Sequence, residues 1–142
     1  MGSVSAPEEA TPGEPVCLLD TSLFIASESG RMLATDRLPA RSAVSVVTVG
    51  ELRRGVLMAA DDDVRSRRLD TLAHATRLDP VPVDEQVAAA WVLLRQRLKA
   101  GGTKMEVNDS WIAATAMARG WPVVTQDDGF PTGIPGLTVL RV

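Results

Sequence analysis

Short apolar segments alternate along the chain with longer segments in which apolar residues recur at helical spacing. The run from Val16 to Leu19 is continuous and apolar, which is typical of a strand buried on both faces of a parallel sheet. Other short segments rich in β-branched or apolar residues predict further strands at 43–48, 121–125 and 137–142. Strands that alternate with helices favour βαβ crossovers, so we expect an α/β fold. It should have three layers, α/β/α, with a mostly parallel central sheet.

Capping residues, helical periodicity and glycines mark the predicted helices. The expected segments are 22–29, one or two turns within 31–38, a helix from about 49, and helices that start at 61–63, 84 and 108. Thr21 or Ser22 can cap the first of them. Leu69 and Leu72 should face the core from the helix that starts at 61–63. Two prolines make 78–83 an edge strand or an extended connector.

Composition predicts one folded unit after a flexible start. Residues 1–15 are small, polar, acidic and proline-rich, so we expect a flexible lead-in there. A chain of 142 residues with 45% hydrophobic content favours a single domain over 16–142. No apolar segment approaches the roughly 20 residues of a membrane span, and the N-terminus lacks the layout of a secretory signal. We therefore expect a soluble cytoplasmic protein, in which the single cysteine, Cys17, is a buried and unreactive thiol.

The formal net charge of −3 argues against the strongly basic footprint of many nucleic-acid-binding proteins. The basic residues are nevertheless almost all arginine, with Lys99 and Lys104 as the two lysines. The arginine guanidinium suits phosphate oxygens, although a coding bias toward arginine explains the composition equally well. The single histidine, His74, has no partner in sequence and is interpreted as a surface or boundary residue rather than a metal ligand.

Four acidic residues stand at comparable junctions between strands and helices. Asp20 and Asp127 each follow an apolar strand, and Glu51 and Asp109 are each expected in the first turn of a helix. In a parallel sheet the carboxyl ends of the strands and the amino ends of the following helices share one edge. The four carboxylates are therefore expected to meet in one crevice, although Asp20 alone could equally be a turn residue or a helix cap.

Carboxylates held a few ångströms apart repel one another unless they bind a cation. Oxygen ligands without histidine or thiol favour a hard ion, so we expect Mg²⁺ or Mn²⁺. Since Mg²⁺ commonly binds one or two carboxylates together with a substrate phosphate, the predicted substrate is a phosphodiester. In this hypothesis the ion activates a water for in-line attack on phosphorus, and the same ion or a second one holds the leaving oxygen.

Four segments, in this order, resemble the PIN-domain ribonucleases, and among them the VapC toxins of bacterial toxin–antitoxin pairs. They are Leu-Leu-Asp20-Thr-Ser, Val-Thr-Val-Gly-Glu51-Leu-Arg-Arg-Gly, Val-Asn-Asp109-Ser-Trp-Ile-Ala-Ala-Thr-Ala and Val-Val-Thr-Gln-Asp127-Asp-Gly-Phe. The resemblance extends from about Val16 to the C-terminus. It implies that Asp20, Glu51 and Asp109 form the principal acidic set around Mg²⁺ or Mn²⁺, with Asp127 as the fourth acid.

The resemblance also implies an endoribonuclease that cleaves single-stranded RNA at structured RNA such as transfer or ribosomal RNA. It further implies a homodimer and inhibition by a cognate VapB-like antitoxin whose tail covers the acidic crevice. One segment departs from the family pattern, which often has a second acid where this chain has Gly129. Asp128 stands between, so either Asp127 or Asp128 can be the fourth acid. The spacing to Thr125 and Phe130 favours Asp127.

Two other functions fit parts of the sequence. A PIN fold could bind RNA or a protein partner without cutting, although the presence of every acid makes this less attractive. A phosphoacceptor signalling domain also gathers acids and Mg²⁺ at strand ends, but it needs a late lysine, and none follows Lys104. Arg53 and Arg54, close to Glu51, could bind RNA phosphates or could simply form an exposed helix face.

Overall fold

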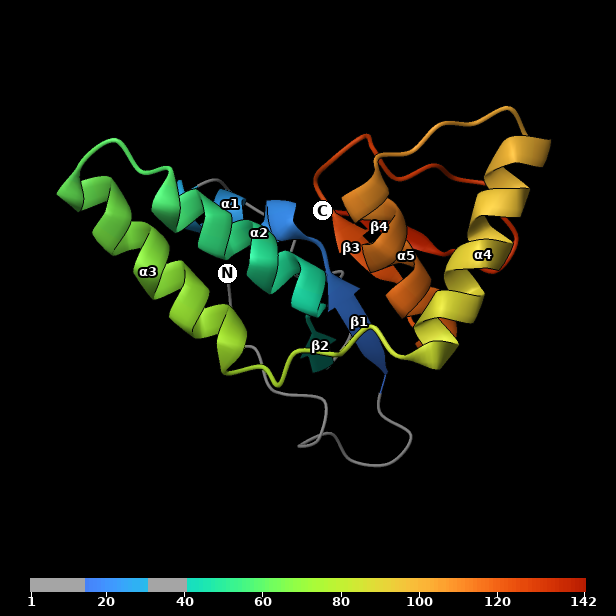
Figure 1. The fold of residues 1–142 in the computed structure, drawn as a ribbon, viewed down its shortest axis with the longest axis horizontal. Coiled ribbons are helices and arrows are strands. Elements are labelled where there is room, and N and C mark those ends of the chain that lie inside the picture. The colour runs from blue at the N-terminus through green and yellow to red at the C-terminus, as the bar shows by residue number, and fades with distance from the viewer. Residues whose placement is uncertain (1–14, 31–40) are drawn as a thin grey trace.

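The computed structural model describes residues 15–30 and 41–142, which contain a four-stranded sheet. The strands are β1 (Val16–Leu19), β2 (Arg41–Ala43), β3 (Val123–Thr125) and β4 (Val139–Arg141). Their order across the sheet is β2-β1-β3-β4, and every neighbouring pair is parallel (Figure 1). This confirms the predicted parallel α/β fold. The carboxyl ends of β1 and β3 consequently lie side by side at one edge of the sheet.

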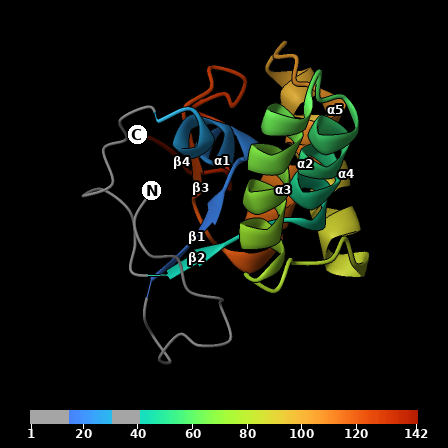
Figure 2. The same cartoon turned by 90° about the vertical axis from the view of Figure 1, so that its left-hand side faces the viewer.

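Helices cover both faces of the sheet. In the described residues they are α1 (Thr21–Glu28), α2 (Val46–Leu57), α3 (Asp62–Thr76), α4 (Glu85–Ala100) and α5 (Val107–Arg119). Helices α4 and α5 pack together on one side, and α1, α2 and α3 lie on the other (Figures 1 and 2). The three layers of the predicted α/β/α architecture are thus present.

The central strands divide their side chains between two hydrophobic cores, because successive residues of a strand point to opposite faces. Leu18 and Val123 face the core under α4 and α5, which also contains Leu94 and Ile112. The neighbouring strand residues face the other core, under α1, α2 and α3. This second core includes Cys17, Leu19, Val124, Phe24, Leu52 and Leu72. The sheet is therefore buried on both sides, as the continuous apolar run of β1 predicts.

The predicted strand at 43–48 is wrong in its position. The strand covers Arg41–Ala43, and α2 already begins at Val46. The side chain of Ser45 accepts a hydrogen bond from the backbone N–H of Val47 at 3.0 Å and so caps the helix. This cap outweighs the β-branched character of the segment. As a result Glu51 lies in the second turn of α2, and the expectation of a first-turn position is wrong.

Other helix boundaries also differ from the sequence expectations. The cap of α1 is Asp20, whereas Thr21 and Ser22 lie inside the helix. Helix α5 begins at 107 rather than 108, and its N-cap residue, Glu106, makes no side-chain capping bond. Leu69 is 48% exposed, so its expected inward position is wrong, while Leu72 is buried as predicted.

Several sequence expectations hold in the structure. Asp84 caps α4, and 78–83 is an extended connector with an isolated bridge between Val81 and Ser45. Cys17 is a buried free thiol whose pKa is raised by burial. His74 lies at the boundary of the second core, edge-on to Phe24. The helical turns expected in 31–38 and the lead-in expected before Pro15 lie outside the described residues.

Candidate active site

The first strand ends on Asp20, which is 1% exposed and precedes α1 directly. Its Oδ2 accepts hydrogen bonds from the Thr125 hydroxyl at 2.9 Å and from the backbone N–H of Ser22 at 3.4 Å. Burial raises the pKa of the Asp20 carboxyl, and the hydrogen bonds from Ser22 and Thr125 lower it. Asp20 is therefore a helix cap and, at the same time, a carboxylate fixed between the ends of β1 and β3.

Glu51 contacts two other helices from the second turn of α2. Its Oε1 accepts a hydrogen bond from the Thr21 hydroxyl at 2.6 Å, and its Oε2 accepts one from the Asn108 side chain at 3.5 Å. The Thr21 hydroxyl also lies 3.0 Å from Oγ1 of Thr48, which is fully buried. The carboxylate thus ties α1 and α5 to α2. It borders a hollow of about 700 Å³ that these helices line with α3.

Asp109 lies in the first turn of α5 and is half-buried. Its own burial raises its pKa to about 7, together with the negative charges of the acids around it. In order of effect these acids are Asp20, Glu106, Glu51 and Asp127. Because charge interactions weaken with distance, each of these carboxylates must lie near that of Asp109. The structure therefore brings the four acids singled out in the sequence into electrostatic contact.

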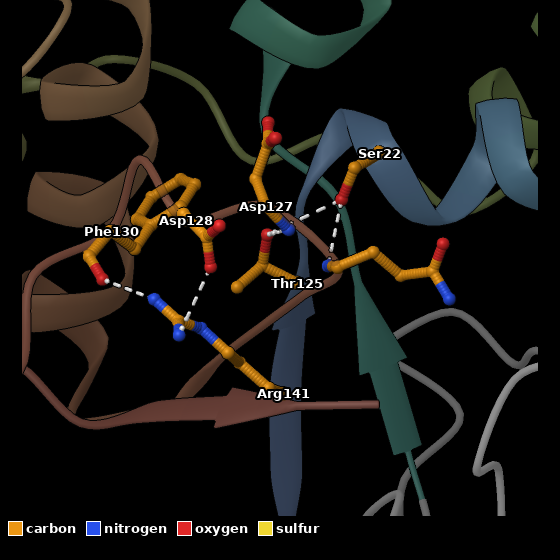
Figure 3. A network of polar contacts seen from close by, with 7 residues as sticks. Ser22, Thr125, Asp127, Asp128, Phe130 and Arg141 are labelled. Atoms are coloured by element: carbon orange, nitrogen blue, oxygen red, sulfur yellow. Dashed lines mark hydrogen bonds and ion pairs between the residues drawn. The ribbon is translucent and has the colours of Figure 1, made fainter.

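The two adjacent acids that follow β3 have different environments. Asp128 forms an exposed ion pair with Arg141 at 3.2 Å. Asp127 donates its backbone N–H to Oγ1 of Thr125 at 2.8 Å and lines a hollow of about 500 Å³ together with Asp109. Figure 3 shows the two carboxylates pointing in different directions, with that of Asp128 turned toward Arg141. Of the pair, Asp127 is the one that shares a hollow with another of the four acids.

Gly129, where the family pattern often has a second acid, lies against the carboxylate of Asp109. A Cβ atom at this position would lie 2.9 Å from Oδ2 of Asp109, closer than such atoms approach in real proteins. The glycine therefore leaves the space into which the Asp109 carboxylate extends. A second acid here would also crowd that carboxylate with another negative charge.

Polar residues beyond the predicted acids also shape this region; of these, Glu106 and Thr125 were not among the predicted site residues. Glu106 lines the hollow of Asp109 and Asp127, and Thr125 joins the backbone of Asp127 to the carboxylate of Asp20. The Ser22 hydroxyl accepts the backbone N–H of Gln126 at 3.0 Å. A usable signal was present, because hydroxyl residues follow or end both central strands, but propensity rules interpret them as helix caps.

The carboxylates are close enough to interact, yet they do not form a closed cage. Within the residues that the structure describes, no three histidine, cysteine, aspartate or glutamate side chains are grouped tightly enough to hold a metal ion by themselves. An all-oxygen set of this kind fits an ion that keeps several of its water ligands, as Mg²⁺ does. The residues present are consistent with such an ion, whose positive charge would relieve the repulsion felt by Asp109.

Comparisons with known proteins identify the family of the chain. The family model described as PIN domain matches residues 17–132. The chain is 46% identical over 127 residues to Ribonuclease VapC5 of Mycobacterium tuberculosis, which covers 88% of this chain and 94% of that protein. It is 44% identical over 126 residues to Ribonuclease VapC4 of the same organism, which covers 88% of this chain and 95% of that protein.

A solved structure agrees with the sequence comparisons. The VapBC-5 toxin–antitoxin complex from Mycobacterium tuberculosis contains a chain that superposes with a TM-score of 0.83 at 43% sequence identity. The match covers 89% of this chain and 98% of that one. The similarity therefore extends over the sheet, both helical layers and the acidic edge.

Proposed function

The chain belongs to the PIN-domain family, and from this premise we propose that it is an endoribonuclease toxin that a cognate VapB-like antitoxin neutralises. Its relatives named ribonucleases are similar over nearly their whole length. The single observation that carries the proposal is the electrostatic coupling of Asp109 to Asp20, Glu51 and Asp127. A carboxyl whose pKa is raised by neighbouring acids at the carboxyl edge of a parallel sheet is typical of a site for a cation and a phosphate.

The proposed cofactor is Mg²⁺ or Mn²⁺, held by Asp20, Glu51, Asp109 and Asp127. When bound, such an ion supplies positive charge that lowers the pKa of water and stabilises the leaving oxygen of a phosphodiester. The residues of the chain hold and orient the acids around it. Thr125 fixes the Asp20 carboxylate by donating to Oδ2. The amino end of α5 adds partial positive charge next to Asp109, where a phosphate would lie.

The test is cleavage of RNA by the purified chain and by two variants, Asp20→Asn and Asp109→Asn. The wild-type chain should cleave RNA only with Mg²⁺ or Mn²⁺ present, and each variant should lose at least 100-fold in rate, because the loss of one acid weakens binding of the ion. Both variants should remain folded, since asparagine keeps the shape of the side chain. Asp70→Asn, on the exposed face of α3, is the matched control and should cleave normally. Full cleavage by both site variants would contradict the assignment.

Regulation by an antitoxin follows from the same relatives. The similar chain of the VapBC-5 structure is part of a toxin–antitoxin complex. We propose that a VapB-like antitoxin binds this chain as well. We also propose that the chain forms a homodimer and acts on RNA in the cytoplasm. No helix within the described residues is long and apolar enough to span a membrane. Co-expression with the small protein encoded next to it should abolish RNA cleavage, and purification of a stable complex would support the assignment.

The alternative is a PIN fold that binds RNA or a partner without cutting. It predicts that RNA binds equally well with and without Mg²⁺ and stays intact in both cases. The electrostatic coupling of the acids disfavours this alternative, because a fold that only binds a polyanion gains nothing from placing carboxylates where the phosphates must lie.

A further inference from the structure

Three basic side chains form a line on α4 and on the loop that follows it. We call Arg95, Lys99 and Lys104 the basic strip; all three are exposed. Arg95 and Lys99 are four residues apart on α4, so they lie on the same face of the helix. No ion pair joins any of the three to a carboxylate within residues 15–30 and 41–142. Their positive charges are therefore available to a ligand.

The basic strip leads to the acidic site through three adjoining hollows. Arg95 and Lys99 line one hollow of about 680 Å³ and share a second, of about 610 Å³, with Lys104. Lys104 also lines the hollow of about 500 Å³ that contains Asp109 and Asp127. Figure 1 shows the loop between α4 and α5 running over the same end of the molecule as the carboxyl end of β1. A surface path thus connects the far end of the strip to the candidate active site.

Aromatic contacts hold the outer end of the strip in place. The guanidinium of Arg95 lies 5.6 Å from the centre of the Trp91 ring, within the range of a cation–π contact. The Trp91 ring in turn stacks on Trp111, with ring centres 4.4 Å apart and planes inclined by 4°. Trp91 also donates from Nε1 to the hydroxyl of Ser110 at 2.9 Å. Since Ser110 and Trp111 follow Asp109 in α5, the basic strip and the acidic site are fixed to the same rigid pair of helices.

The positive charges of the basic strip can offset the repulsion between the acidic site and the phosphates of RNA. Carboxylates repel the phosphates of an approaching nucleic acid, so cations beside the site are needed to hold the nucleic acid next to it. Three cations spread along connected hollows match one sugar–phosphate backbone, whereas a duplex would need a wider basic surface. We propose that the basic strip binds the backbone of single-stranded RNA and guides it into the acidic hollow. This inference rests on the proposed nuclease function.

The experiment measures binding of a fluorescein-labelled single-stranded RNA of about 15 nucleotides and mixed sequence, by anisotropy in EDTA. The strip variant is Arg95→Gln, Lys99→Gln and Lys104→Gln combined, which removes three charges and keeps most of each stem. The control variant removes three exposed arginines on α3 and at its C-cap, by Arg65→Gln, Arg67→Gln and Arg77→Gln. Helix α3 lies at the opposite end of the molecule from α4 in Figure 1, so the two variants differ in place and not in net charge.

The strip variant should bind the RNA at least 10-fold more weakly than the wild type, and the control variant within about twofold. The slope of log K against log salt concentration should fall by about 2 in the strip variant, because each phosphate contact on a single strand contributes about 0.7. A duplex of the same sequence should bind more weakly than the single strand. Melting temperatures of both variants should stay near that of the wild type, because all six side chains are exposed.

Equal losses in the two triple variants would overturn the inference, since net charge alone would then explain binding. A strip variant that binds RNA normally but changes sedimentation from dimer to monomer would also overturn it and identify α4 as an interface between copies. If the wild type cleaves RNA and the strip variant binds RNA as tightly as the wild type does, this inference is wrong but the proposed function is unaffected. Binding that depends on the strip, without any cleavage in Mg²⁺ or Mn²⁺, defeats the proposed function instead.

Discussion

Asp109 interacts with four neighbouring carboxylates, and this makes the stability of the metal-free protein depend on pH. Its pKa rises to about 7 in the folded state, against about 3.9 for an unperturbed aspartate. Between these values the folded chain binds a proton that the unfolded chain has released, so stability is lost as the pH rises through this window. The raised pKa of Asp20 acts in the same direction.

The melting temperature in EDTA should therefore fall between pH 5 and pH 8, and the Asp109→Asn variant should show a smaller fall. Above pH 7 this variant should also melt at a higher temperature than the wild type, because the repulsion is relieved. Asp70→Asn serves as the control with a distant exposed carboxylate. An identical pH dependence in wild type and Asp109→Asn would mean that the neighbouring acids do not act on Asp109.

Gly129 provides a second prediction for a single position. In Gly129→Ala the new methyl group would meet Oδ2 of Asp109 at 2.9 Å, and the flexible carboxylate would move away. The cost in stability should be small, since a side-chain end moves and not the backbone. RNA cleavage should nevertheless fall by about 10-fold or more, because a catalytic group displaced by 1 Å can cost about 100-fold in rate. Gly101→Ala is the control, because Gly101 lies outside the acidic site and a Cβ atom there would make only ordinary contacts of 3.5 Å or more.

At the scale of elements, the Thr125 hydroxyl adds a side-chain link to the backbone hydrogen bonds between the ends of β1 and β3. Thr125, at the end of β3, donates to the Asp20 carboxylate and accepts from the backbone N–H of Asp127. Thr125→Val keeps the shape of the side chain and removes both bonds. The free energy of unfolding should fall by about 1–3 kcal/mol, because the buried carboxyl of Asp20 loses a hydrogen-bond partner. Urea unfolding measures this loss.

Thr115→Val is the matched control for Thr125→Val. Thr115 is also fully buried, but its hydroxyl donates within α5 to the carbonyl of Trp111. That carbonyl lies in a helix interior and keeps a backbone partner, so the control should lose less than Thr125→Val. A smaller loss in Thr125→Val than in the control would show that this hydroxyl does not hold the strand ends together.

At the scale of the whole molecule, binding of a divalent ion should stabilise the fold. A ligand that binds the folded state alone, at 100 times its dissociation constant, adds about 2.7 kcal/mol to the free energy of unfolding. Mg²⁺ or Mn²⁺ should therefore raise the melting temperature by several degrees over EDTA, and KCl at matched ionic strength should not. Asp20→Asn and Asp109→Asn should each reduce the rise. An equal rise in both variants would place the stabilising ion elsewhere.

Sequence periodicity was sufficient to predict the layered fold, because a central strand that is buried on both faces must consist of consecutive apolar residues. The run Val16–Leu19 and the segment around Val123 identified the two middle strands. The strand expected at 43–48 was misplaced because β-branched residues also fit a buried helix turn once Ser45 supplies the cap. Local propensity cannot weigh that cap against tertiary packing.

The sequence by itself determined that strands and helices alternate around a parallel sheet. It also determined which acids stand at the junctions between them, because periodicity and chain direction fix the edge of the sheet that each junction reaches. Only the tertiary structure decided that Glu51 is held by Thr21 and Asn108, and that Asp128 turns to Arg141 while Asp127 shares a hollow with Asp109. It also decided that Glu106 joins them. These outcomes depend on side-chain direction and on charges from distant segments, which no local pattern of residues records.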